Sequence, residues 1–348
     1  MKLPVQDLDH ILAHTRDLWQ ELRGERLFIT GGTGFFGTWL LESFTRANDA
    51  LNLKAVANVL SRNPASFLER APHLASRSDL KFVSGDLETF EFPEGTFRFV
   101  IHAGTTSGEP MQPRKQFQTI VRGTQRVLDF AESHGTRRFL FVSSGAVYGT
   151  QPSNLSHVSE DFSGAPPCCD PASAYGEGKR AAELLCSTYA GDFDVLCARC
   201  FAFVGPHLPL DAHYAIGNFI RDALGGRTIR VSGDGMPYRS YLYAADLAIW
   251  LWVILFRGRS RRPYNVGSNQ PVQIRALAES IADTAGMPGR VEVTGERRSE
   301  VPAPRYVPNT MRACEELNLQ VWISQQDAIA RTLEWHRWCA AAAPGKEC

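Results

Sequence analysis

Near the start of the chain stands Thr30-Gly31-Gly32-Thr33-Gly34-Phe35-Phe36-Gly37, between an apolar run at residues 26–30 and a predicted helix that extends through Thr45. The glycine spacing G-x-x-G-x-x-G lets a backbone turn tightly and approach a pyrophosphate without a Cβ clash. The helix that follows presents free N–H groups and the positive end of its dipole to the phosphates. The stretch therefore predicts a dinucleotide-binding loop. Its predicted cofactor contacts are Gly31, Thr33, Gly34, Phe35, Phe36 and Gly37.

Apolar runs alternate with helical patterns after this loop. Parallel strands need helical crossovers, so the alternation is typical of an α/β fold. We therefore predict a Rossmann-like, doubly wound parallel sheet. Its predicted strands are residues 26–30, 54–60, 81–84, 97–102, 138–143 and 193–202. Two further helices are predicted over residues 117–134 and from about 173 to 189.

The chain is predicted to fall into three regions. Residues 1–24 carry a leading amphipathic helix at residues 5–23, which Gly24 ends. Residues 25–203 form the predicted NAD(P)-binding domain. The pattern is less regular afterwards, so residues 204–348 are predicted to form mainly a smaller C-terminal substrate-binding lobe, with a segment near 240–268 returning to the first domain.

Composition argues against several classes of partner. The 348 residues carry no formal net charge, so no field favours nucleic acid or an anionic membrane. The longest apolar run, residues 247–256, is too short to span a bilayer and is predicted to be a buried helix. The N-terminus lacks an apolar signal core, and the eight cysteines have no framework spacing. We expect a cytoplasmic protein with reduced thiols.

Two cysteine pairs are interpreted as structural. Cys197 and Cys200 form C-x-x-C, but they lie in a predicted strand, where positions three apart face opposite ways. Cys168-Cys169 lies in a proline-rich loop. No metal site is predicted.

The end of the second predicted strand bears on the choice of cofactor. An acidic residue there selects NAD, whereas a nearby arginine accommodates the 2′-phosphate of NADP. This chain has Ser61-Arg62 and no Asp or Glu, which favours NADP. The alternative is that Arg62 is a solvated loop arginine or stacks on adenine, which leaves NAD open.

Three residues are candidates for proton transfer. Tyr175 and Lys179 are four apart on a predicted helix, so they share one face. A phenol titrates near pH ~10, and a neighbouring ammonium lowers that pKa by favouring the phenolate. Ser144, at the end of the fifth predicted strand, can hold a reacting hydroxyl in line with Tyr175. Tyr175 would take a proton from a sugar hydroxyl, or give one to a ketone, while a hydride passes to or from nicotinamide.

With these motifs in place, the chain resembles the extended short-chain dehydrogenase/reductase family of NAD(P)-dependent nucleotide-sugar epimerases, dehydratases and reductases. The resemblance covers about residues 25–340. Beyond the motifs above, it rests on the segments at residues 143–149, 205–206, 239–247 and 264–267. It also rests on Asp86-Leu87 and on His102-Ala103-Gly104.

The resemblance implies roles for these residues. Asp86 and Leu87 would contact adenine. The segment His102-Ala103-Gly104 would form a wall of the cofactor site.

The resemblance also implies a substrate site for a nucleoside-diphosphate sugar. Asn218 and Arg239 would hold the diphosphate, and the planar guanidinium of arginine suits phosphate. Arg305, Thr106 and Ser144 are further expected substrate contacts.

The departures from the family pattern narrow the expected reaction. In the family that this chain resembles, the 4,6-dehydratases share an Asp-Glu pair directly after the catalytic Ser or Thr. The related decarboxylases carry a Glu in this segment. Gly145 and Ala146 stand there in this chain. Dehydration and decarboxylation are therefore disfavoured, and 4-epimerisation or 4-keto reduction remains. Ile120 and Ala202 also replace asparagines usual in the family.

Other readings stay open. A non-catalytic cofactor-binding protein of the same fold would not need Ser144, Tyr175 and Lys179 together. A reductase of apolar, steroid-type substrates would not need Asn218 and Arg239. Many relatives dimerise through two helices per subunit, which here are the two predicted over residues 117–134 and 173–189, so a homodimer is expected.

Overall fold

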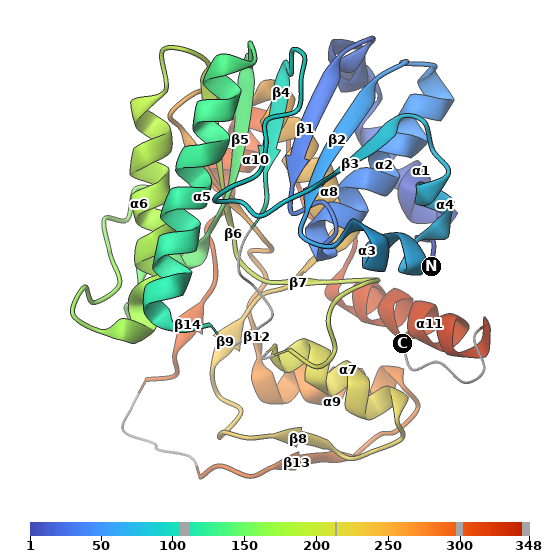
Figure 1. Ribbon diagram of the computed structural model, residues 1–348. Coiled ribbons are helices and arrows are strands. Elements are labelled where there is room, and N and C mark those ends of the chain that lie inside the picture. The colour runs from blue at the N-terminus through green and yellow to red at the C-terminus, as the bar shows by residue number, and fades with distance from the viewer. Residues whose placement is uncertain (105–110, 213, 297–301, 343–348) are drawn as a thin grey trace.

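A computed structural model of the chain describes residues 1–104, 111–212, 214–296 and 302–342. Within these residues, seven parallel strands form the central sheet in the order β11-β6-β5-β4-β1-β2-β3 (Figure 1). The strands are β1 (Arg26–Thr30), β2 (Val56–Ser61), β3 (Leu80–Ser84), β4 (Phe99–His102), β5 (Arg138–Ser144), β6 (Asp194–Cys200) and β11 (Pro263–Val266). This confirms the predicted Rossmann-like, doubly wound parallel sheet.

Helices cover both faces of this sheet because its strands are apolar on both sides. Leu27 and Ile29 of β1 pack with the core on one face, and Phe28 packs with the core on the other. The helices on the first face are α1 (Val5–Thr15), α2 (Phe35–Leu51) and α8 (Ala244–Arg257). Those on the second are α5 (Pro113–Ser133) and α6 (Ala174–Thr188), which lie side by side in Figure 1.

Smaller elements lie below the carboxyl ends of the large sheet in Figure 1. Strand β9 (Tyr238–Arg239) pairs with both β12 (Val272–Gln273) and β14 (Arg305–Tyr306). Further elements there are α7 (Ala215–Leu224), β8 (Ile229–Val231), α9 (Ile274–Thr284) and β13 (Val291–Val293). The assignment of residues 204–348 to a substrate-binding lobe stays a prediction.

The remaining elements are short or connect these layers. They are η1 (Arg16–Leu22), α3 (Pro64–Arg70), α4 (Pro72–Ala75), η2 (Gly145–Tyr148), η3 (Pro171–Ser173), β7 (Phe203–Val204), β10 (Leu242–Tyr243), α10 (Met311–Leu317) and α11 (Gln325–Ala342).

The leading segment predicted as a helix at residues 5–23 is helical over residues 5–22, with a change of winding within it. The α-helix ends at Thr15, and residues 16–22 continue as the 3₁₀ helix η1. The Thr15 hydroxyl donates to the Ile11 carbonyl and accepts from the Trp19 indole, which helps bury Trp19 in the tighter winding. The predicted sixth strand at residues 193–202 also ends earlier, at Cys200.

Helix α1 packs between α2 and α8 and ties the start of the chain to its far end. The Asp7 carboxylate is fully buried and accepts hydrogen bonds from the Tyr243 hydroxyl at 2.6 Å and from Arg331 at 2.6 Å. The Trp335 indole of α11 donates to the Lys2 carbonyl at 3.1 Å. These buried polar contacts fix α1 against the core.

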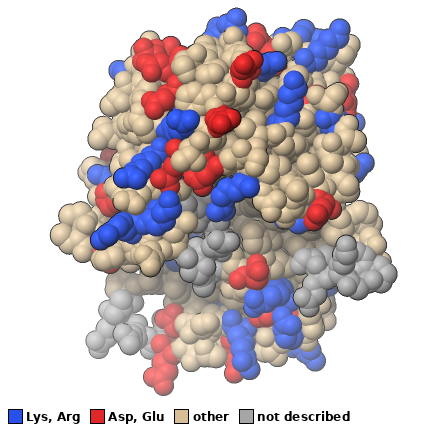
Figure 2. Space-filling view, viewed as in Figure 1, with Lys and Arg blue, Asp and Glu red and all other residues tan. Residues whose placement is uncertain are grey.

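Residues 244–256 of α8 are all buried, which confirms the predicted buried helix at 247–256. In the described part of the chain, no helix combines the length and apolar character that crossing a bilayer requires. Basic and acidic side chains are interspersed on the face seen in Figure 2. Cys197 and Cys200 pack with opposite faces of the sheet, as predicted.

Candidate active site

The glycine loop lies where the strand order reverses, between β1 and β4. In open α/β sheets, ligands bind at this reversal, outside the carboxyl ends of the strands. Gly31 has φ +71°, and a Cβ there would lie 2.6 Å from the Gly104 nitrogen on the neighbouring loop. A Cβ at Gly37 would lie 2.3 Å from the Gly31 carbonyl oxygen. Both positions therefore require glycine for the fold itself.

Gly34 differs, because its glycine is not required by the protein's own packing. A Cβ there would meet, among the described residues, only the Gly31 carbonyl oxygen, at 3.5 Å. Gly34 is also the N-cap of α2, and no side chain caps this helix in the described structure. An open cradle beside uncapped helical N–H groups fits a dinucleotide pyrophosphate.

Replacing Gly34 by Ala is expected to weaken cofactor binding about tenfold or more while the melting temperature stays unchanged. The added methyl group would project into the space left for the pyrophosphate, as the second glycine of such loops allows close approach. Calorimetric titration with NAD and NADP measures this. Gly191→Ala is the matched control, because its Cβ would meet nothing within 4 Å. An unchanged affinity in Gly34→Ala would contradict the assignment of this loop.

His102 at the end of β4 supports the wall of this site. Its ring is buried between two hydroxyls, with Nδ1 2.7 Å from Thr30 Oγ1 and Nε2 3.1 Å from Thr124 Oγ1. Burial lowers the pKa of His102 to about 3, so the ring is neutral. Thr30 also accepts a hydrogen bond from the Gly104 N–H at 3.0 Å. His102 therefore joins the ends of β1 and β4 rather than carrying a charge.

The other predicted cofactor residues surround the same loop. The hydroxyls of Thr33 and Ser61 lie 3.1 Å apart, which brings the glycine loop to the end of β2. Arg62 follows on the exposed surface. Leu87 packs closely against Gly104, since a Cβ added at Gly104 would lie 3.0 Å from the Leu87 side chain. Asp86 is exposed and accepts a hydrogen bond from the Glu88 N–H at 2.9 Å.

Lys179 is held beneath Tyr175 on α6. Its ammonium is buried, donates to the Val142 carbonyl of β5 at 2.8 Å and lies 4.7 Å from the centre of the Phe141 ring. Burial lowers the pKa of Lys179 from 10.5 to about 8. Lys179 and the partly buried Tyr175 are four residues apart and share one helical face.

Activity is expected to decline as the pH rises through about 8, because Lys179 then loses the proton that favours a Tyr175 phenolate. A loss of protein stability caused by deprotonation of Lys179 would not explain this decline in activity. The folded protein binds fewer protons at Lys179 between pH 8 and 10.5, so the free energy of unfolding rises with pH there.

The measurement is kcat/KM from pH 6 to 10, with melting curves at each pH. Lys179→Arg keeps the charge in this range, so its remaining activity should lack the alkaline decline. An unchanged decline in that variant would contradict this role for Lys179.

Ser144 ends β5 and faces a residue that the sequence did not indicate. Its hydroxyl accepts the Ala146 N–H at 3.2 Å, and the Tyr306 hydroxyl lies beside it, next to Gly145. Tyr175 and Arg239 lie near the same tyrosine. The structure thus brings Ser144, Tyr175 and Arg239 around one tyrosine from β14. The sequence feature that could have pointed to Tyr306 is Gly145, because a glycine there leaves space that another side chain has to fill.

Besides Ser144, the described predicted substrate residues occupy two strands and one helix. Arg239 of β9 lies 5.9 Å from the centre of the Tyr306 ring. Arg305 of β14 lies 4.1 Å from the centre of the Tyr238 ring, on the same small sheet. Asn218 lies partly buried on α7, and Thr106 lies outside the described residues.

A polar network supports the segment after Ser144. The Tyr148 hydroxyl donates to Asn265 Oδ1 at 2.7 Å, which joins two of the segments that carry the family resemblance. Arg199 of β6 donates to the Tyr148 hydroxyl at 2.9 Å and to Glu183 Oε2 at 2.7 Å. Ser143, next to Ser144, donates to Glu183 Oε1 at 2.5 Å. Sequence reasoning missed this network.

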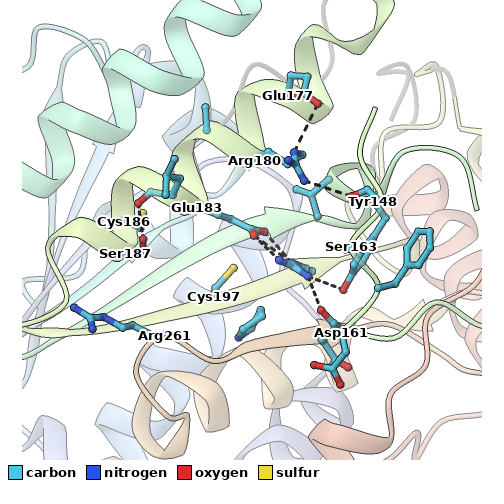
Figure 3. A pocket seen from close by; sticks show the side chains of 18 of the residues that line it. Tyr148, Asp161, Ser163, Glu177, Arg180, Glu183, Cys186, Ser187, Cys197 and Arg261 are labelled. Carbon is cyan, nitrogen blue, oxygen red and sulfur yellow. Dashed lines mark hydrogen bonds and ion pairs between the residues drawn. The ribbon is translucent and has the colours of Figure 1, made fainter. Parts of the chain in front are cut away.

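The network also lines a pocket of about 850 Å³ beside α6. Figure 3 shows Glu183 extending from α6 into this pocket, with dashed lines marking its ion pair. None of the predicted catalytic or cofactor residues lines the pocket. The candidate active site at the glycine loop and Ser144 is therefore separate from this pocket.

Comparison with known proteins agrees with this geometry. The model of the NAD dependent epimerase/dehydratase family matches residues 27–267, which span the glycine loop, Ser144, Tyr175 and Lys179. The chain belongs to this family. The match confirms the resemblance that the sequence motifs carry.

Relatives of this epimerase/dehydratase chain carry out different reactions. UDP-glucuronic acid decarboxylase 1 of Xenopus tropicalis is 26% identical over 318 residues, covering 90% of this chain and 72% of the relative. UDP-glucose 4-epimerase of Mycolicibacterium smegmatis is 27% identical over 325 residues, covering 90% and 98%. The crystal structure of dTDP-glucose 4,6-dehydratase from Streptomyces venezuelae, which contains NAD, has a TM-score of 0.75 at 24% identity and covers 92% and 99%.

These comparisons establish an enzyme family of NAD-dependent nucleotide-sugar epimerases, dehydratases and decarboxylases. Relatives at this level of identity catalyse several different reactions, so the reaction of this member depends on its own site residues.

Proposed function

We propose that this protein moves a hydride at C4 of a nucleoside-diphosphate sugar, either as a 4-epimerase or as a 4-ketoreductase. The observation that carries the proposal is the pair Gly145-Ala146 directly after Ser144. Neither residue offers an acid or a base, which elimination of water from the sugar would require. Hydride transfer at C4 needs only a proton donor or acceptor and a group that orients the C4 oxygen.

Tyr175 would handle the proton. Its phenolate oxygen would take the proton from the C4 hydroxyl, and its phenol would return one to a C4 ketone. Lys179, held by the Val142 carbonyl, would favour the phenolate through its charge. Ser144 would hold the C4 oxygen in line with Tyr175. A nicotinamide bound beside the glycine loop supplies the hydride acceptor or donor.

The diphosphate of the substrate would lie near Arg239 and Arg305. Both arginines are partly buried on neighbouring strands, and each guanidinium group lies over the ring of a tyrosine of the same small sheet. Arg239 Nη1 donates to the Tyr238 carbonyl at 2.8 Å, and the planar guanidinium group of each arginine suits contact with phosphate oxygens. Asn218 of α7 would add an amide contact.

The two reactions make different use of the cofactor. An epimerase retains its cofactor and returns the hydride to the other face of the sugar, whereas a reductase consumes NADPH. The exposed Arg62 after Ser61 favours a reductase that uses the 2′-phosphate. The likeness to UDP-glucose 4-epimerase of Mycolicibacterium smegmatis favours an epimerase with retained NAD.

The test is absorbance at 340 nm after mixing the protein with NADPH and a panel of nucleoside-diphosphate 4-keto-6-deoxysugars. Stoichiometric loss of NADPH identifies a 4-ketoreductase. Without such loss, the same protein is incubated with UDP-, dTDP-, CDP- and GDP-sugars, and the products are separated to detect the C4 epimer. Formation of a 4-keto-6-deoxysugar or of carbon dioxide would contradict the proposal.

We also propose a homodimer formed through α5 and α6. Phe117 of α5 is 38% exposed and Leu184 of α6 is 69% exposed, which places large apolar side chains on both helices. Sedimentation velocity tests this, and a monomer at micromolar concentration would contradict it.

A further inference from the structure

Tyr306 occupies the space that a side chain at position 145 would need. A Cβ at Gly145 would lie 2.7 Å from the Tyr306 hydroxyl oxygen and 2.8 Å from Phe201. Contacts below 3.0 Å are not found for real Cβ atoms, so one of these groups would have to move. The glycine at 145 and the tyrosine at 306 therefore depend on each other, although 161 positions separate them in the chain.

The Tyr306 ring has two close neighbours. It packs against Phe201 in a tilted arrangement with ring centres 4.7 Å apart, and Arg239 lies 5.9 Å from its centre on the paired strand β9. The partly buried ring therefore contacts both an aromatic side chain and a guanidinium group.

The backbone after Tyr306 is anchored as well. The Val307 N–H donates to Gln151 Oε1 at 2.9 Å, and the Val307 carbonyl accepts from the Val158 N–H at 3.0 Å. The Asn309 N–H donates to the Val158 carbonyl at 2.8 Å. The 150–170 loop thereby holds Tyr306 in place, which makes a change of its ring position costly.

We propose that Tyr306 is a positioning residue of the active site, whose hydroxyl fills the space beside Gly145 and orients the Ser144 hydroxyl toward the reacting C4 oxygen. This inference rests on the proposed function, because it takes Ser144 as the group that binds this oxygen. It also gives the absence of an acidic side chain at position 145 a physical reason, since such a side chain would collide with Tyr306.

The two tyrosines of the site would then have different tasks. Burial raises the pKa of Tyr306 above its usual value, and the neighbouring Ser144 hydroxyl opposes this only in part. Tyr306 therefore keeps its proton at working pH and acts as a fixed hydroxyl. Tyr175, in contrast, must lose and regain its proton.

The kinetic test is Tyr306→Phe, which removes only the hydroxyl. We expect kcat to fall about tenfold with KM and cofactor affinity changed less than about twofold, since the hydroxyl beside Ser144 is lost. In a Ser144→Ala background the same replacement should change kcat less than about twofold, because the group it orients is missing. Tyr264→Phe is the control, since its hydroxyl contacts Glu316 and not Ser144.

The packing test uses the protein without cofactor. Gly145→Ala should lower the melting temperature in the wild type, and this loss should be about 2 °C or more smaller in a Tyr306→Phe background, where the nearest oxygen is gone. Phe201 is present in both backgrounds and contributes equally to each.

An active wild type with an equally active Tyr306→Phe variant would overturn the inference. Equal effects of Tyr306→Phe with and without Ser144, or equal losses from Gly145→Ala in both backgrounds, would also overturn it. Failure of the proposed function gives a different pattern, in which wild type and variant alike turn over no nucleotide sugar.

Discussion

Tyr175→Phe is expected to lower kcat about 10³-fold while cofactor affinity and melting temperature stay unchanged. The replacement removes the only atom of this side chain that can exchange a proton with the C4 oxygen. Positioned general acid–base groups contribute about 10²–10⁴-fold to catalysis. Lys179 and Ser144 keep their own contacts, so the remaining protein should bind substrate and cofactor normally.

The measurement is single-turnover hydride transfer, followed at 340 nm, with binding of NAD and NADP measured separately. Tyr189→Phe is a matched control at the C-cap of the same helix, because its hydroxyl contacts Asp129 and Gln125 and not the active site. A Tyr175→Phe variant that keeps more than about a tenth of the wild-type kcat would contradict the proposal that Tyr175 transfers the proton.

Arg199→Met is expected to lower the free energy of unfolding by about 3 kcal/mol. Breaking a buried ion pair leaves the remaining charge, here that of Glu183, without a counter-charge. Glu183 and Arg199 are each only 15% exposed, with the guanidinium also donating to the Tyr148 hydroxyl. Without the guanidinium, the Glu183 carboxylate keeps a donor in Ser143 but loses its counter-charge.

Urea denaturation measures this change. Arg275→Met is the control, because Arg275 pairs with Glu279 on an exposed helix surface, where the two side chains are 62% and 47% exposed. Its loss should cost less than about 0.5 kcal/mol. Equal destabilisation by the two variants would show that the network beside α6 contributes no special stability.

Much of the sheet could be predicted from the sequence because its signals are local. Strands β1 to β6 appear as short apolar runs bounded by turn residues, and the glycine loop fixes where the cofactor site lies. Tyr175 and Lys179 are also local, since a spacing of four places two side chains on one helical face. The sequence does not indicate an element boundary where a tertiary contact decides it. The end of α1 at Thr15 is an example, because the burial of Trp19 accompanies the change to a 3₁₀ helix.

Tyr306 was not predicted, although the family resemblance pointed to the adjacent Arg305, because no spacing in the sequence links Tyr306 to Ser144. Strand β14 has two residues, and its position next to Ser144 depends on pairing with β9 and on contacts with the 150–170 loop. The sequence signal for it is indirect: a glycine at 145 leaves space that another part of the chain has to fill. The partners of Glu183 were missed for the same reason, since Arg199 and Ser143 come from two different strands.

The buried carboxylate of Asp7 has a consequence for the order in which the protein folds. Its partners Tyr243 and Arg331 lie 236 and 324 positions later in the chain. At about 5–20 residues synthesised per second, Asp7 waits roughly 16 to 65 s before Arg331 has been made. Contacts with such large sequence separation form late, since their loop-closure entropy has to be overcome first. Helix α1 is made well before the residues that hold it, and it therefore docks late instead of nucleating the fold.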